Sequence, residues 1–183
     1  MSDRYQQKLK EAEFFYNQMV EVQDNRDQFR FYLSSFLSAS RSVLQYAFEE
    51  TNLGKNPNAK PGAQKWHQDA VTNSRFISYL KDVRDDNIHI SPIDPRAHIG
   101  IKFTEVIGLG ESLSASINGE KQITVPEKHK AILVSKGIPP EVTYKYVFDN
   151  WPESEDVIQV CRMYLDELES FVKEGIAKGF ISG

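Results

Sequence analysis

Residues 29–47 read FRFYLSSFLSASRSVLQYA, and this stretch decides the fold. Its apolar residues recur every three or four positions, which is the period of an amphipathic α-helix. Small side chains fill the middle of the run, so a neighbouring helix can approach closely, and its serines can bond to carbonyl groups of their own helix. Asp24 or Asn25 offers an N-cap, and we expect the helix to continue to about Glu50.

Two further helices flank this one in the sequence. The spacing of apolar residues predicts a helix from about Asp3 to Val22 and another that begins near Ala63. The helix that begins near Ala63 is expected to run without a break to His89. Pro92 and Pro95 then end it, because proline disfavours a helical conformation in the residue before it.

A last long helix is predicted by polar start signals between residues 150 and 156. Gly175 and Gly179 are expected to weaken this helix and then to end it. Its apolar stripe comprises Val157, Cys161, Tyr164, Leu165, Leu168, Phe171, Val172 and Ile176.

Between the third and last helices the apolar period changes to two, which indicates β-strands. Apolar residues alternate with polar ones at 99–103 and again at 113–117, and Asn118-Gly119 marks a hairpin. We expect a three-residue loop of residues 117–119, which pairs Leu113 with Ile123 and keeps the apolar residues of both strands on one face. The segment 127–135 is interpreted as a short helix and 144–148 as a strand.

The predicted fold is mainly α: a four-helix up-and-down bundle with a small antiparallel β-rich insertion between the third and last long helices. A chain of 183 residues is most simply one domain, 1–183. The bundle would take residues 1–96 and 150–183, and the insertion residues 97–149.

Composition narrows the classes of function. The net charge of −4 and a pI near 5.6 argue against a broad basic surface for nucleic acid, so any phosphate contact must be local. The single cysteine, Cys161, excludes an internal disulfide and is interpreted as a buried thiol. Because the N-terminus is too polar for a signal peptide and no apolar run approaches the length of a membrane span, we expect a cytoplasmic protein without membrane contact.

The chemistry is expected at the end of the third helix, in Val83-Arg84-Asp85-Asp86-Asn87-Ile88-His89. Arg84 is a fixed cation that can hold phosphate, and His89 titrates near neutrality. Asp85 lies four residues before His89 on the same helix face, where its carboxylate could orient the imidazole. Arg84 and His89 are ~140° apart around a regular helix, so they converge only if the last turn distorts or a second subunit closes the site.

Other interpretations of these residues stay open. The motif could be a solvated helix end, with a cation near the C-terminal carbonyl groups. His89, Asp94 and His98 have the side-chain types of a metal site but irregular spacing, and we expect neither a metal nor a cofactor. His67 and Asp69 are interpreted as parts of a polar helix face.

Four long amphipathic helices with an Arg-polar-x3-His motif at the end of the third resemble the HEPN superfamily, helical bundles named for higher eukaryotes and prokaryotes nucleotide-binding. The serine-rich second helix, Phe31 to Leu44, resembles that of many bacterial members. The resemblance implies a homodimer in which both motifs face one cleft, and metal-independent endoribonuclease activity in active members. It places Arg84 at the family arginine, Asp85 at the polar residue and His89 at the histidine. Ser91 stands where some toxin members have a modifiable tyrosine, which argues against a toxin of that type.

Two functions follow as hypotheses. In the first, the chain is a hydrolase that cuts RNA through Arg84, His89 and Asp85 at a dimer cleft. In the second, it is a non-catalytic homodimeric module whose β-rich insertion binds an unknown protein partner. The acidic pI favours the binding module, and the intact motif favours the enzyme.

Overall fold

The structure, a computed structural model, describes residues 4–102, 114–117, 121–124 and 141–183. It is mainly helical with small β-sheets, as predicted. The helices are α1 (Arg4–Glu21), α2 (Arg26–Thr51), α3 (Ala63–Asn73), α4 (Arg75–His89) and α5 (Val157–Ala177). The strands are β1 (Arg96–Lys102), β2 (Ser114–Ile117), β3 (Lys121–Thr124) and β4 (Glu141–Val147).

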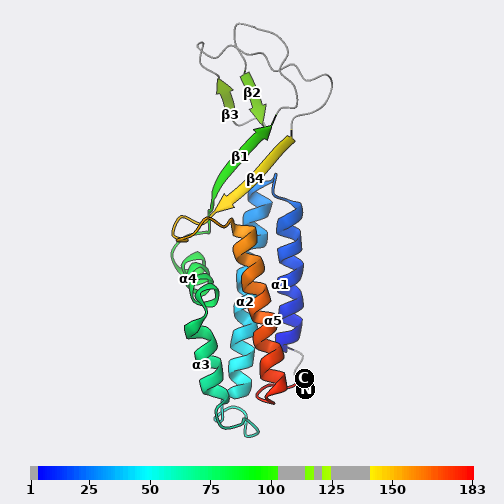
Figure 1. Cartoon of the computed structure of the whole chain (residues 1–183), viewed down its shortest axis with the longest axis vertical. Helices are drawn as coiled ribbons and strands as arrows, with labels where there is room; N and C mark the ends of the chain where they lie inside the picture. The colour runs from blue at the N-terminus through cyan, green and yellow to red at the C-terminus, as the bar shows by residue number, and fades with distance from the viewer. Residues whose placement is uncertain (1–3, 103–113, 118–120, 125–140) are drawn as a thin grey trace. The chain divides into compact units, whose positions relative to one another are not determined.

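The chain forms two compact units. The first unit comprises Met1–Ala97 and Lys145–Gly183 and contains all five helices, and the second is His98–Tyr144. In the first unit α1 and α3 run in one direction, whereas α2 and α5 run in the other (Figure 1).

Helix α2 is the central helix of the bundle, because it contacts α1, α3, α4 and α5. It begins where the sequence predicts, since the Asn25 side chain accepts a hydrogen bond from the Gln28 backbone N–H at 3.1 Å. The large apolar residues on its inner side are buried, and burying each one stabilises the fold by about 1.5–3 kcal/mol, whereas Phe31 and Phe48 are exposed. The buried apolar residues of α2 are Phe29, Leu33, Phe36, Leu37, Ala39, Val43, Leu44 and Ala47.

The third predicted helix is two helices, so the expectation of one unbroken helix from Ala63 to His89 was wrong. Ser74 separates α3 from α4 with an extended backbone (φ −83°, ψ 120°). Its hydroxyl accepts a hydrogen bond from the Ile77 N–H at 3.0 Å and so caps α4. The same hydroxyl donates to Glu167 on α5. Serine favours a cap over a helix interior because its side chain competes for nearby backbone groups.

The strands form two pairs, β1 with β4 and β2 with β3. In the antiparallel β2–β3 pair Ile117 lies opposite Lys121 and Ala115 lies opposite Ile123. The predicted pairing of Leu113 with Ile123 was therefore wrong, and residues 118–120 connect the strands instead of 117–119. The register still pairs odd positions with odd positions, which keeps both apolar sets on one face. The short helix predicted at 127–135 lies outside the described residues.

Helix α5 begins with a capping box. The Asp156 carboxylate accepts from the Gln159 N–H at 2.8 Å, and the Gln159 side chain accepts from the Asp156 N–H at 3.1 Å. The predicted apolar stripe is buried except for Ile176, which is half-buried. Cys161 is among the buried residues, as predicted, and burial raises the pKa of its thiol well above the usual value.

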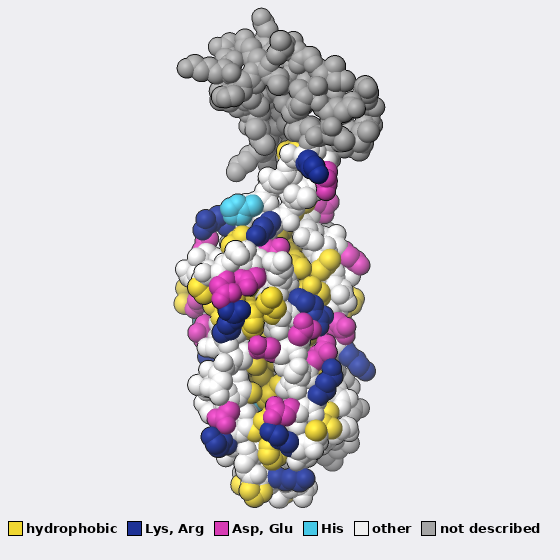
Figure 2. Space-filling model, in the orientation of Figure 1, with side chains coloured by type: hydrophobic (Ala, Val, Ile, Leu, Met, Phe, Trp, Pro, Cys, Tyr) yellow, Lys and Arg dark blue, Asp and Glu magenta, His cyan; other side chains and the backbone are white. Residues whose placement is uncertain are grey.

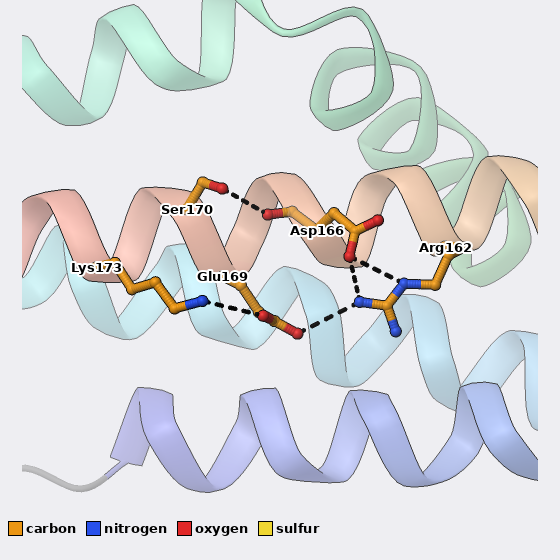
Figure 3. Close-up of polar contacts among 5 residues, drawn as sticks. All are labelled: Arg162, Asp166, Glu169, Ser170 and Lys173. Atoms are coloured by element: carbon orange, nitrogen blue, oxygen red, sulfur yellow. Dashed lines mark hydrogen bonds and ion pairs between the residues drawn. The ribbon is translucent and has the colours of Figure 1, made fainter.

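The solvent side of α5 has a chain of paired charges (Figure 3). Arg162 donates to Asp166 at 3.0 Å and to Glu169 at 3.4 Å, and Glu169 also accepts from Lys173 at 3.3 Å. Each of these cations therefore has a carboxylate partner within its own helix. Exposed pairs of this kind contribute only a few tenths of a kcal/mol each.

Candidate functional site at the end of α4

The last two turns of α4 contain Arg84, Asp85 and His89, and the helix ends at His89, as the proline positions predict. The backbone N–H groups of Ile90 and Ser91 both donate to the Asp86 carbonyl, at 2.9 and 3.1 Å. This contact closes the final turn without distorting the helix before it. Arg84 and His89 therefore remain ~140° apart around the helix axis.

Arg84 is held by Asp85. Its Nη1 donates to the Asp85 carboxylate at 2.9 Å, and its side chain is 27% exposed. The Arg84 Nε is buried and has no hydrogen-bond partner among the described residues. A guanidinium has five donors in a planar fork, so Arg84 keeps donors that an incoming oxyanion can use.

Asp85 lies among cations. Lys81 Nζ is 3.7 Å from one oxygen of the Asp85 carboxylate, and Arg84 bonds to the other oxygen. Partial burial acts to raise the pKa of Asp85, but the hydrogen bond from Arg84 and the charge of Lys81 outweigh it. The charges of Arg84 and of Arg41 on α2 act in the same direction, and the net pKa of Asp85 is lowered. The carboxylate is thus ionised at neutral pH.

His89 is exposed to solvent. Within the described residues it makes no hydrogen bond and no ion pair, and Asp85 contacts Arg84 and Lys81 instead. The expected contact between Asp85 and His89 is therefore absent from the described part of the chain. The exposed imidazole is therefore not held by a neighbouring side chain among the described residues.

Asn87 is a residue of this site that sequence reasoning missed. Its amide nitrogen donates to the Ser34 hydroxyl on α2 at 2.8 Å, and its amide oxygen accepts from the Ile93 N–H at 2.8 Å. Arg30 in turn donates to the Ile93 carbonyl at 3.0 Å. Asn87 therefore joins α4, α2 and the segment after α4 at one point.

The face of α2 next to the site is rich in serine. Ser38 donates to the Ser34 carbonyl at 3.0 Å, and Ser42 donates to the Ser38 carbonyl at 2.8 Å. Ser35 donates to the Phe31 carbonyl at 2.9 Å. These bonds within α2 confirm the predicted structural role for Ser35, Ser38 and Ser42, whereas the Ser40 hydroxyl is buried without a partner.

A small pocket of about 250 Å³ lies beside the end of α4. Its lining includes Tyr79, Asn87 and three carboxylates, Asp86, Asp94 and Asp149. Asp94 pairs with Arg26 and Asp149 pairs with Arg96. The carboxylates of the lining disfavour the binding of an anion, so we do not expect an RNA phosphate to bind in this pocket.

The remaining candidates from the sequence have structural roles. His67 was expected on a polar helix face but is only 7% exposed, and its Nε2 is 2.9 Å from the Leu44 carbonyl. Asp69 is exposed and pairs with Lys65 at 3.3 Å. The described residues contain no group of three or more His, Cys, Asp or Glu side chains that could hold a metal ion.

The surface of the helical unit agrees with a local site. Basic and acidic side chains are interspersed on the face drawn in Figure 2, without a broad basic area. Among the described helices, none combines the length and apolar character that a membrane span requires.

Comparisons of the chain with protein-family models, with curated proteins and with solved structures found no match.

Proposed function

We propose that this chain is a metal-independent endoribonuclease of the HEPN type, which acts through Arg84 and His89 at a cleft between two copies. The observation that carries the proposal is the state of these two side chains. Arg84 is 27% exposed and uses only one Nη1 donor on Asp85, and His89 is exposed without a partner in the described residues. A cation and a titratable base that are both available suit phosphodiester chemistry.

In the proposed reaction the RNA 2′-oxygen attacks the adjacent phosphorus, and the bond from phosphorus to the 5′-oxygen breaks. His89 takes the proton from the 2′-hydroxyl or gives one to the leaving 5′-oxygen. Arg84 donates hydrogen bonds to the phosphate oxygens, where negative charge increases in the transition state. The products are a 2′,3′-cyclic phosphate and a free 5′-hydroxyl.

Asp85 would act on Arg84 in this reaction. Its hydrogen bond to Arg84 Nη1 fixes the plane of the guanidinium and leaves the remaining donors for the phosphate. Orientation of His89 by Asp85, the role that the sequence suggested, would require the carboxylate to exchange its partners when RNA binds.

A second copy is needed because α4 is regular as far as His89. One copy presents Arg84 and His89 on different sides of the helix, so a twofold-related α4 would supply the missing member of each pair. The proposed interface therefore includes α4 and the neighbourhood of Arg84.

The test is cleavage of a labelled single-stranded RNA with EDTA present. His89→Ala is expected to lower the rate by ~10²- to 10⁴-fold without unfolding the protein, because a positioned proton transfer contributes that much. Arg84→Lys keeps the charge but loses the planar fork, so it is expected to be impaired as well.

The control is Arg162→Lys, because Arg162 is paired with carboxylates on the far side of α5 and should not affect the rate. Product ends with a cyclic phosphate support the mechanism. Activity that survives both His89→Ala and Arg84→Lys, or a wild type that cuts none of a varied set of RNAs, would contradict it.

One observation favours the second function, a non-catalytic homodimeric module. Ile88 and Ile90, on either side of His89, are 48% and 78% exposed. Exposed large apolar residues are common singly, but a pair next to a candidate site suits a protein contact. A stable dimer without cleavage in the RNA assay would support this function, with the β-rich insertion as the contact for a protein partner.

A further inference from the structure

We propose that Arg41 forms a second phosphate subsite, which binds the backbone phosphate next to the one that Arg84 binds. This inference deepens the proposed function and rests on it. The ligand is a single RNA strand that binds across α2 and α4 and contacts both arginines.

The first step is the contact between the two helices. The Asn87–Ser34 hydrogen bond joins α4 to α2. Moving back along α4 from Asn87 reaches Arg84 after one turn, and moving forward along α2 from Ser34 reaches Arg41 after two turns. Arg41 lies near the Arg84–Asp85 pair, because its charge acts on the Asp85 carboxylate that Arg84 bonds to.

The second step is the state of Arg41. Every other described arginine has a carboxylate partner within 4.0 Å, whereas Arg41 makes no ion pair or hydrogen bond in the described part of the chain. Arg41 is also half-buried, so water solvates it only in part. A half-buried cation without a counter-ion is unfavourable, and a bound anion would relieve this cost.

The third step is the charge around Arg41. Arg41 acts electrostatically on Asp85, and that carboxylate already neutralises charge from Arg84 and Lys81. The charge of Arg41 also acts on His67 of α3 and on Tyr164 of α5. Arg41 therefore lies near both of these helices. Asp85 is thus shared between three cations, and Lys81 also pairs with Asp82 at 3.3 Å, so three cations face two carboxylates here. The surface around Arg41, Arg84 and Lys81 is therefore locally positive, although the chain has a net charge of −4.

The experiment measures the salt dependence of RNA binding. Binding of a fluorescein-labelled single-stranded RNA is followed by anisotropy over a salt series, in a His89→Ala background so that the RNA stays intact. Each phosphate contact contributes about 0.7 to the slope of log affinity against log salt for single strands. Arg41→Gln is expected to reduce that slope by ~0.7, and Arg41→Lys to retain it because the charge remains.

The matched control is Arg162→Gln, which removes an arginine that already has partners and should leave the slope unchanged. Thermal melting verifies that each variant is folded. If Arg41→Gln does not fold, Arg41→Met, which keeps the length of the side chain without its charge, replaces it, and a slope equal to that of wild-type position 41 contradicts the subsite.

The outcomes separate this inference from the proposed function. RNA binding with a slope that depends on Arg41, but no cleavage by the wild type, keeps the subsite and removes the nuclease. Cleavage by the wild type with a slope that Arg41→Gln does not change removes the subsite and keeps the nuclease. Absence of RNA binding overturns the subsite outright.

Discussion

Asn87 is the side chain that fixes the end of α4, because it bonds to Ser34 on α2 and to the Ile93 backbone. Asn87→Ala removes both hydrogen bonds and leaves the Ile93 N–H without its acceptor. We expect a loss of about 1–2 kcal/mol in the free energy of unfolding, measured by urea denaturation.

The Ser34 bond can be isolated with a double-mutant cycle of Asn87→Ala and Ser34→Ala. Ser35→Ala is the matched control, because the Ser35 hydroxyl bonds only to the Phe31 carbonyl of its own helix. Equal losses in the free energy of unfolding for Asn87→Ala and Ser35→Ala, with strict additivity in the cycle, would contradict a stabilising link between Asn87 and Ser34.

His67 gives the helical unit a predictable response to acid. Burial lowers the pKa of His67, and the nearby Arg41 charge adds to this effect, although the hydrogen bond to the Leu44 carbonyl opposes it. An unfolded histidine titrates near 6.5, so below that pH the unfolded chain binds more protons than the folded one. Stability is therefore expected to be complete above pH 6.5 and to fall as the pH decreases towards the pKa of folded His67.

The measurement is urea denaturation at pH 7.5 and at pH 5.5, for the wild type and for His67→Gln. The variant is expected to be less stable at neutral pH but to lose less stability on acidification, because position 67 no longer titrates. His89→Gln, at an exposed position, serves as the control and should keep the wild-type response. A wild type that is equally stable at both values would contradict the assignment.

Sequence reasoning placed Arg84 and His89 in the last two turns of a helix, and the structure agrees, because proline and helical spacing together determine where α4 ends. It did not find Asn87 or the state of Arg41, since hydrogen bonds between distant segments leave no periodic pattern. It also assigned Asp85 to His89, whereas the adjacent Arg84 and the lysine one turn earlier take the carboxylate. A polar residue three positions after the arginine, on the side that faces α2, was the signal that could have indicated Asn87.

At the scale of elements, the starts of α2 and α5 were predictable from their capping residues, and the stripe of α5 from its period. The break at Ser74 was not, because the apolar stripe continues across it from Trp66 to Leu80. Two shorter helices can bury the apolar residues of that stripe as well as one long helix can. The hydrogen bond from Ser74 to Glu167 favours the break.

Gly175 is required by packing within α5 rather than by a turn. A Cβ at this position would lie 2.4 and 2.7 Å from two ring atoms of Trp66, and 2.9 Å from Ile181. Trp66 cannot move aside easily, because its ring stacks on Phe171 with centroids 4.2 Å apart. Gly175→Ala would gain about 1 kcal/mol of helix propensity, but the overpacking costs about 1–3 kcal/mol.

We therefore expect Gly175→Ala to be destabilising, with a lower midpoint of thermal unfolding. The control is the same substitution in a Trp66→Leu background, where the shorter side chain leaves room and the alanine should be neutral or stabilising. A variant that melts above the wild type would show that the Trp66 contact is not tight.

At the scale of the whole molecule, the helical unit has a core of its own within Met1–Ala97 and Lys145–Gly183. The apolar periods predicted a mainly helical chain with a few β-strands before the last helix, and the described residues have this composition of elements. The hairpin register was less predictable, because a shift of both strands together keeps the same alternation of faces.

The assembly prediction concerns how two copies share the proposed site. Because Arg84 and His89 lie ~140° apart on a regular α4, each site is expected to combine Arg84 of one subunit with His89 of the other. Arg84→Ala and His89→Ala proteins should each be inactive, yet a mixture that exchanges subunits should regain activity. Half of the dimers would be mixed and each would have one intact site of two, which predicts about a quarter of the wild-type rate. Light scattering on the same samples should show dimers at micromolar concentration. Monomers, or a mixture as inactive as its components, would place both residues of a site in one chain and contradict the shared cleft.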